Sequence, residues 1–126
     1  MHRSRLAGFI IDCRTDDLGA AADFWSNALG MGTRIMSGQE AGKYVTLVDP
    51  GDRLGIEVQK VDHESRVHLD IETDDVDAEV RRLEQLGAKR VARVQSWWVM
   101  MAPTGQKFCV VRARNGNFAE LANRWD

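Results

Sequence analysis

The sequence has few residues that interrupt or cross-link a chain. Its 126 residues include two prolines and two cysteines, and it has no low-complexity stretch. Cys13 and Cys109 lie far apart in a chain without a recognisable export signal, so we expect no disulfide framework. We interpret Cys13 as a small buried hydrophobic residue. The length is typical of a single domain, here residues 1–126.

The first apolar run is short. It extends from Leu6 to Ile11 and stops at Asp12, which is too short for a secretory signal or a membrane span. We therefore expect a cytoplasmic protein with no membrane partner.

The sequence also lacks a strong excess of charge. Its formal net charge is −2, and its 17 basic residues are scattered apart from small groups such as Arg81 and Arg82. A nucleic-acid partner would require a basic stripe that displaces counterions, so we expect none. The sequence contains no GxGxxG, P-loop, GxSxG, HExxH or CxxC motif, which argues against the chemistries tied to those motifs.

What the sequence does contain is an internal repeat. Residues Thr15-Asp16-Asp17-Leu18 recur as Thr73-Asp74-Asp75-Val76, and each copy follows a segment of alternating polarity. Both prolines fall late in their halves and are followed closely by glycine. The repeat predicts two similar modules, at about residues 1–62 and 63–116, with a C-terminal segment at 117–126.

Periodicity predicts the same order of elements in both modules. Each module opens with a strand whose two faces differ. In the first strand, one face carries Phe9, Ile11 and Cys13, and the other carries Ile10, Asp12 and Arg14. In the second strand, the apolar face carries Val67, Leu69 and Ile71, and the polar face carries His68, Asp70 and Glu72. An Asp-capped amphipathic helix follows and ends at Gly30 or Gly87. Three strands then complete each module, at about 32–37, 43–48 and 54–61, and at 89–94, 97–101 and 107–112. The expected fold is α+β with two tandem βαβββ modules.

The last ten residues do not repeat. Asn117 and Glu120 resemble a capping box, and Phe118, Leu121 and Trp125 form one stripe at helical spacing. We expect a short docking helix or part of a subunit contact.

This arrangement resembles the vicinal oxygen chelate superfamily, which includes glyoxalase and bleomycin-resistance proteins and the related dioxygenases. Three segments in order are similar to that family: residues 16–30, residues 68–88 and the turn Ala102-Pro103-Thr104-Gly105. The resemblance implies a curved mixed sheet around a cup, with helices outside and a small-molecule ligand inside. The apolar strand faces would pack against the helices, and the polar faces would form the site.

The resemblance also implies a divalent metal, for which the sequence gives an incomplete ligand set. His68 matches the family's second-module histidine, Ile10 replaces its first-module counterpart, and Cys109 stands where a glutamate is common. Cys109 follows Pro103 by six residues, and the corresponding position after Pro50 in the first module is Ile56. A shift of one residue would bring Glu57 or Gln59 into the site instead. The set His68, Glu57 and Cys109 suits zinc chemically. Either no metal or a divalent metal fits the sequence.

Without a metal, His68 has two interpretations. It is either a strand histidine hydrogen-bonded to Asp12 or Asp70, or a general acid–base oriented by such a carboxylate. Asp12, Asp70 and Glu72 would then contribute electrostatics or hydrogen bonds. Arg14 would hold an anionic group of the ligand, or form a cross-strand salt bridge.

Aromatic residues would form the walls of the cup. Trp97 and Trp98 are consecutive on a strand, so only one of them can face the cup, and the repeat aligns Trp97 with Tyr44. Ordinary core filling is the alternative for each. Tyr44, Trp97, Arg14 and Cys109 are therefore the candidate ligand-binding residues.

Three functions remain open. The chain is a metal-independent lyase or isomerase of glyoxalase-like type, a non-catalytic protein that sequesters a ligand, or a divalent-metal enzyme such as a dioxygenase. The incomplete metal set favours the first two. Family resemblance also implies a homodimer.

Overall fold

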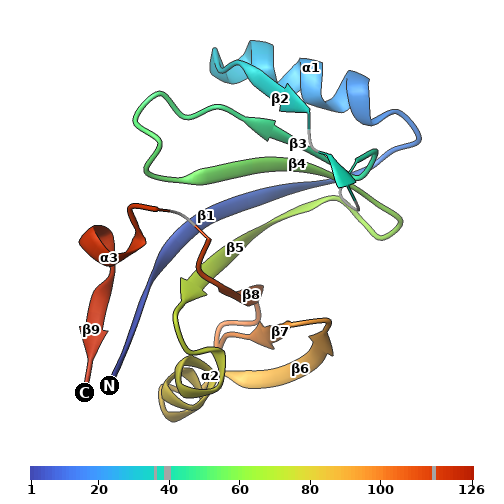
Figure 1. The fold of residues 1–126 in the computed structure, drawn as a ribbon. Helices are drawn as coiled ribbons and strands as arrows, with labels where there is room; N and C mark the ends of the chain where they lie inside the picture. Colours follow the sequence, from blue (N-terminus) through green and yellow to red (C-terminus); the bar gives the residue numbers. More distant parts are fainter. Residues whose placement is uncertain (36, 39–40, 115) are drawn as a thin grey trace. The chain divides into compact units, whose positions relative to one another are not determined.

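The computed structural model describes residues 1–35, 37–38, 41–114 and 116–126. The chain forms two compact units (Figure 1). The first unit is Gly8–His68, and the second unit combines Met1–Ala7 with Leu69–Asp126. Among the described residues, no helix is long and apolar enough to span a membrane.

The first unit has the predicted βαβββ order. It contains β1 (His2–Arg14) from Gly8 onward, α1 (Leu18–Leu29), β2 (Thr33–Ile35), β3 (Tyr44–Leu47) and β4 (Gly55–Val61), in the sheet order β2-β3-β4-β1. Strands β1 and β4 are parallel, whereas β3 is antiparallel to both β2 and β4. Gly8 and Gly55 are register partners, and a Cβ on Gly8 would lie 1.7 Å from the Gly55 carbonyl oxygen.

The second unit repeats the plan and extends it. Its elements are β5 (Arg66–Thr73) from Leu69 onward, α2 (Val76–Gln85), β6 (Lys89–Val94), β7 (Trp97–Met101), β8 (Lys107–Arg112), α3 (Phe118–Leu121) and β9 (Asn123–Trp125). The sheet order is β5-β8-β7-β6, and β9 pairs with the beginning of β1. The α+β class and the βαβββ order are thus confirmed. Residues 1–7, which the sequence assigned to the first module, pack with the second unit.

Strand β6 is the last strand in this order, and its side chains are largely exposed. It carries Lys89, Arg90 and Arg93, and a bulge interrupts its pairing with β7 between Arg90 and Ala92. The guanidinium carbons of Arg90 and Arg93 lie 5.0 and 6.0 Å from the centre of the Trp98 ring. The long side chains of this strand therefore cover an aromatic residue of the sheet.

The repeated Thr-Asp-Asp sequence builds the same cap twice. The Asp17 carboxylate accepts a hydrogen bond from the Ala20 amide at 3.0 Å, and Asp75 accepts one from the Ala78 amide at the same distance. The preceding threonine accepts from the amide of each capping aspartate. These bonds satisfy backbone donors at the first turn of each helix and explain where α1 and α2 begin.

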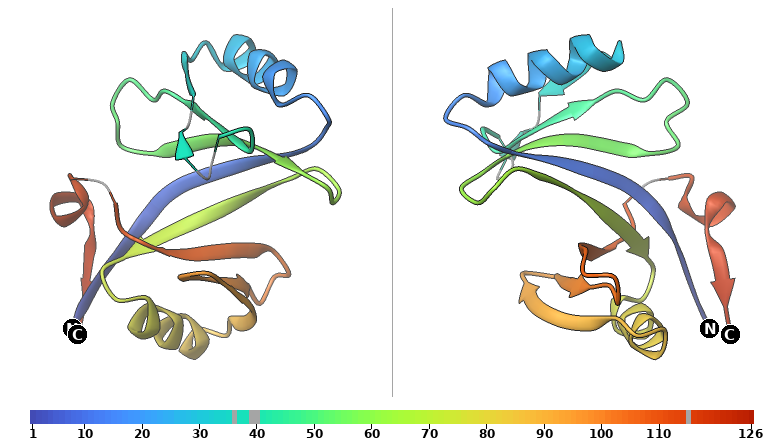
Figure 2. Two further views of the ribbon diagram at one scale, coloured as in Figure 1. Left: turned by 45° about the vertical axis from the view of Figure 1, so that its right-hand side comes forward. Right: turned by 180° about the vertical axis from the view of Figure 1, so that it is seen from behind.

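Helices α1 and α2 each pack on one face of the sheet in their own unit (Figures 1 and 2). Below α1 the buried core consists of Ile11, Leu47, Ile56 and Val58; below α2 it consists of Val80, Leu83, Ala88, Met100 and Val110. Ile71 packs against the second core as predicted. The prediction was wrong for Val67 and Leu69, which are 60% and 51% exposed. The principal contacts of α2 are with β6, β7 and β8.

The prediction of one C-terminal helical stripe was wrong. Helix α3 ends at Leu121, Ala122 is extended, and Trp125 belongs to β9. The beginning of β1 supplies a pairing partner for this segment, with His2 opposite Trp125. The Trp125 indole N–H donates a 2.8 Å hydrogen bond to the Ser4 hydroxyl. Backbone pairing and this bond favour the strand over a second helical turn.

A buried ion cluster joins three elements of the second unit. The Glu79 carboxylate on α2 is fully buried and lies 2.8 Å from both His2 Nε2 and Arg82 Nε. The Arg82 guanidinium stacks over the Trp125 ring at 3.9 Å. Burial opposes ionisation of Glu79, but hydrogen bonds from Arg82, His2 and Ser4 outweigh it and lower its pKa. The cluster connects β1 and β9 to α2.

Candidate functional site

Strand register divides the polar and apolar residues of the first unit between two faces. Ile11 pairs with Val58 on the face that α1 covers. On the opposite face, register partners form two rows across β1, β4 and β3. One row is Ile10, Glu57 and Thr46. The other row is Asp12, Gln59 and Tyr44. Tyr44 therefore lies on the face that carries Asp12.

The register also decides between the alternatives for β4. Ile56 is 8% exposed and belongs to the core below α1. Because successive residues of a strand point to opposite faces, Glu57 and Gln59 share the face of Asp12. Of the residues considered for this strand, Glu57 and Gln59 therefore lie on the face of Asp12, and Ile56 lies on the other face.

The centre of this face is a carboxylate–imidazole pair. Asp12 on β1 is 2% exposed, and its Oδ2 lies 2.8 Å from Nδ1 of His68 at the start of β5. An ionised aspartate accepts hydrogen bonds, so Nδ1 carries a proton and Nε2 is the nitrogen that would exchange protons with a ligand. The other carboxylate oxygen of Asp12 is buried without a hydrogen-bond partner among the described residues. Of the two partners considered for His68, the structure pairs it with Asp12.

An arginine also lies near the same carboxylate. Arg66 Nε lies 3.4 Å from Asp12 Oδ2, and Arg66 Nη2 lies 3.4 Å from His63 Nε2. Sequence reasoning did not identify Arg66. Its position two residues before His68, on the same face of β5, was the available signal.

The remaining candidates lie on the corresponding face of the second unit. Asp70 on β5 is the register partner of Cys109 on β8, which in turn pairs with Val99 on β7. Trp97 shares the face of Val99 because the two residues are two positions apart on one strand. Trp98 lies on the other face and packs against the core below α2.

Glu72 is the deeply buried acid of this face. It is 3% exposed, and its nearest described cation is Arg5 on β1, whose Nε lies 3.8 Å from Oε1. That distance is too long for a hydrogen bond, and Arg5 Nε donates to the Leu6 carbonyl instead. Burial raises the pKa of Glu72, and Arg5 offsets only part of this rise. Arg5 is a second residue that sequence reasoning missed.

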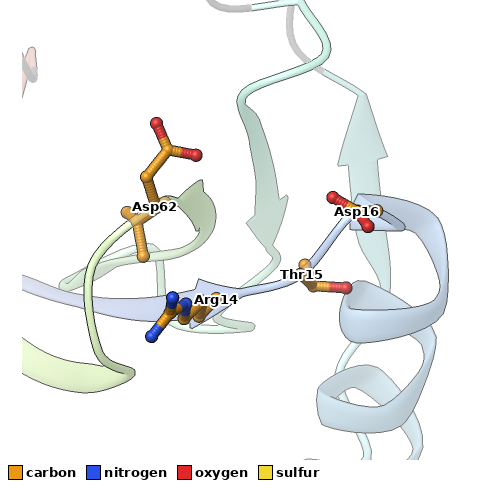
Figure 3. Close-up of a pocket in the computed structure, with 5 residues that line it drawn as sticks. Arg14, Thr15, Asp16 and Asp62 are labelled. Carbon is orange, nitrogen blue, oxygen red and sulfur yellow. The ribbon is translucent and has the colours of Figure 1, made fainter.

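Arg14 lies apart from these pairs, at the end of β1. It lines an open depression with Thr15, Asp16, Val61 and Asp62 (Figure 3). Its amide donates to Ser65, and among the described residues its guanidinium forms no salt bridge. The predicted cross-strand salt bridge is therefore not seen in this part of the chain. Two carboxylates near Arg14 make the depression a poor site for an anion.

Two candidate metal donors lie together in the second unit. Asp70 on β5 and Cys109 on β8 are register partners. Carboxylate and thiolate are both zinc ligands. The other two candidate ligands, His68 and Glu57, belong to the first unit, where the Asp12–His68 hydrogen bond resembles the contact that orients metal-binding histidines.

Solved structures share this fold at low sequence identity. A Mn(II)-bound glyoxalase from Novosphingobium aromaticivorans aligns with a TM-score of 0.60 and 16% identity, over 89% of this chain and 40% of that one. A methylmalonyl-CoA epimerase from Mycobacterium tuberculosis aligns with a TM-score of 0.57 and 19% identity, over 90% and 93%. A protein described as an NAD-dependent benzaldehyde dehydrogenase from Legionella pneumophila aligns with a TM-score of 0.62 and 10% identity, over 84% and 99%. At these identities the likeness shows the fold alone.

Sequence comparison supplies the family. No curated protein matches this chain significantly. The model of the glyoxalase-like domain family matches residues 8–111, which include both βαβββ modules and all the candidate residues described above except Arg5. This chain belongs to the glyoxalase-like domain family.

Proposed function

We propose that this chain is a small-molecule lyase or isomerase that moves a proton on a carbon atom, with His68 as the acid–base group. The observation that carries this proposal is the 2.8 Å contact between His68 Nδ1 and the buried Asp12 carboxylate. A carboxylate at Nδ1 fixes the tautomer of the ring and stabilises the imidazolium that forms when Nε2 takes up a proton. Such a pair can take up a proton from a carbon acid and give it back.

The face around the pair suits a small polar ligand. Tyr44 and Gln59 lie in the same row as Asp12, and Glu57 lies in the next row. An aromatic side chain among hydrogen-bonding groups is typical of sites that orient small organic molecules. Structural neighbours include methylmalonyl-CoA epimerases. Epimerisation requires removal and return of a proton at one carbon.

Divalent metal chemistry is the second candidate, favoured by the pairing of Asp70 with Cys109 in the second unit. A divalent ion bound by these donors would polarise a ligand oxygen as a Lewis acid. Elemental analysis of protein purified without chelators separates the two candidates: one equivalent of divalent metal per chain would support the second, and its absence after reconstitution would contradict it.

Deuterium incorporation tests the main proposal. We expect the protein in D2O to exchange the C2 proton of methylmalonyl-CoA, measured by proton NMR. His68→Gln should slow the exchange by about 100-fold, since general acid–base groups contribute at least that factor. Asp12→Asn should slow it by about tenfold or more, because the amide no longer favours the correct tautomer.

His2→Gln is the control, since His2 lies in the ion cluster of the second unit. An unchanged exchange rate in a folded His68→Gln protein would contradict the proposal. Binding of the thioester without exchange would instead indicate a sequestering protein.

A further inference from the structure

Arg66 holds an unusual position beside the proposed acid–base group. It is at the first position of β5, two residues before His68, and its side chain is 44% exposed although its contact Asp12 is buried. Its contacts to Asp12 and His63 are both 3.4 Å, longer than good hydrogen bonds between such groups. Asp12 therefore attracts the guanidinium toward His68 without using its donors fully.

The short contact of Asp12 goes to His68. Oδ2 lies 2.8 Å from His68 Nδ1 and 3.4 Å from Arg66 Nε, and Oδ1 is buried without a hydrogen-bond partner in the described part of the chain. No hydrogen bond of Arg66 Nη1 is found among the described residues. A planar guanidinium with an unused edge is suited to two parallel hydrogen bonds to a carboxylate.

We propose that Arg66 determines the substrate class by binding a carboxylate of the substrate next to His68. This inference rests on the proposed function, because it places the substrate within reach of the acid–base pair. The substrate would be a small carbon acid with a free carboxylate. Two hydrogen bonds to that group would hold the molecule so that a neighbouring carbon faces the imidazole.

Arg14 is the alternative cation in the first unit. It lies in the depression formed with Asp16 and Asp62, whose negative charges oppose an incoming anion. Arg66 has one described carboxylate contact, Asp12, which it shares with His68. Charge thus favours Arg66 over Arg14 as the carboxylate ligand.

Calorimetric titration with methylmalonate and its dimethyl ester tests this proposal, because the two compounds differ in charge but share a carbon skeleton. We expect the wild-type protein to bind methylmalonate at least about tenfold more tightly than the diester. Arg66→Gln should remove this preference by weakening methylmalonate binding about tenfold. Arg66→Lys should keep part of it, since an ammonium is a point charge without the planar fork.

Arg14→Gln is the competing variant, and Arg81→Gln on α2 is the matched control; both should bind as the wild type does. Circular dichroism establishes that each variant is folded, and Arg66→Lys keeps the cation beside Asp12 if Arg66→Gln does not fold. The proposal is overturned if the wild type shows no preference, if Arg66→Lys binds both compounds exactly as the wild type does, or if Arg14→Gln loses the preference. If the wild type prefers methylmalonate through Arg66 but exchanges no C2 proton of methylmalonyl-CoA, the proposed function is contradicted. The inference that Arg66 binds a carboxylate would still stand.

Discussion

The two units share one plan but stabilise their buried acids differently. In the first unit, Asp12 accepts a short hydrogen bond from His68. In the second, Glu72 has Arg5 at 3.8 Å, and burial raises its pKa. Both acids lie on the sheet face opposite the helix, so the scaffold does not dictate their chemistry. The repeated fold thus places a buried carboxylate at a similar position in each unit. The side chain that contacts this carboxylate determines its hydrogen bonding and its pKa.

The largest expected effect concerns the close approach of β1 and β4 in the first unit. Gly8→Ala would place a Cβ 1.7 Å from the Gly55 carbonyl oxygen, so the strands would have to separate. We expect urea denaturation to show a loss of about 3 kcal/mol or more in the free energy of unfolding. Gly32→Ala is the control, because its added Cβ would meet nothing within 4 Å. A loss below about 0.5 kcal/mol for Gly8→Ala would contradict this account.

The next effect belongs to the ion cluster of the second unit. Glu79→Gln should lower the free energy of unfolding by about 2 kcal/mol at pH 7, because it removes the charge that pairs with Arg82 and His2. The folded-state pKa of Glu79 is lowered, so its contribution is present above its ordinary value of 4.5 and lost as pH falls through the folded value. Denaturation of both proteins from pH 3 to 7 measures this difference.

Glu84→Gln provides the matched control, since Glu84 pairs with Arg90 where both side chains are about 40% exposed. An exposed pair contributes little, so the change should be much smaller than that of Glu79→Gln. Equal losses for Glu79→Gln and Glu84→Gln would show that burial of the cluster is unimportant.

Removal of the helix caps should affect both units equally. Asp17→Ala and Asp75→Ala each delete one 3.0 Å hydrogen bond to the backbone. We expect each change to cost about 1 kcal/mol in thermal or urea denaturation. Asp16→Ala serves as a neighbouring control that leaves both capping bonds in place. Costs that differ by more than about 1 kcal/mol would indicate that the caps are not equivalent.

The smallest effect should be a gain in stability. Glu72→Gln removes a carboxyl whose folded-state pKa is raised above its ordinary value of 4.5. A raised pKa favours folding below the ordinary value, and this contribution is lost as pH rises through the folded value. The variant should therefore be more stable than the wild type at pH 7, by about 0.5 kcal/mol, with a smaller difference at pH 4. Lower stability of the variant at pH 7 would show that the charged form of Glu72 is well solvated.

Local patterns predicted most elements, because caps, glycine stops and alternation act within a few residues. The Thr-Asp-Asp repeat located both helices, and alternation predicted the face of Asp12. The face of Glu57 was left open and required the register of β4. The pairing of β9 with β1 was missed because it depends on residues at opposite ends of the chain. Arg5 and Arg66 were missed for the same reason: their acidic contacts come from other strands.

The catalytic, ligand-binding and metal roles of the candidate residues stay predictions. Sequence alone identified His68, but the choice between Asp12 and Asp70 as its partner required a distance. A hydrogen bond between strands depends on register, which a single sequence does not specify.

The cations of strand β6 have a consequence for behaviour at high concentration. A terminal strand with exposed backbone groups can pair with the same strand of another molecule and start aggregation. Lys89 and Arg93 place positive charges along this strand, Arg90 is paired with Glu84, and the bulge after Arg90 breaks its regular ladder. Two molecules approaching through β6 would therefore repel each other and align poorly, which should keep the protein in solution without a partner covering that strand.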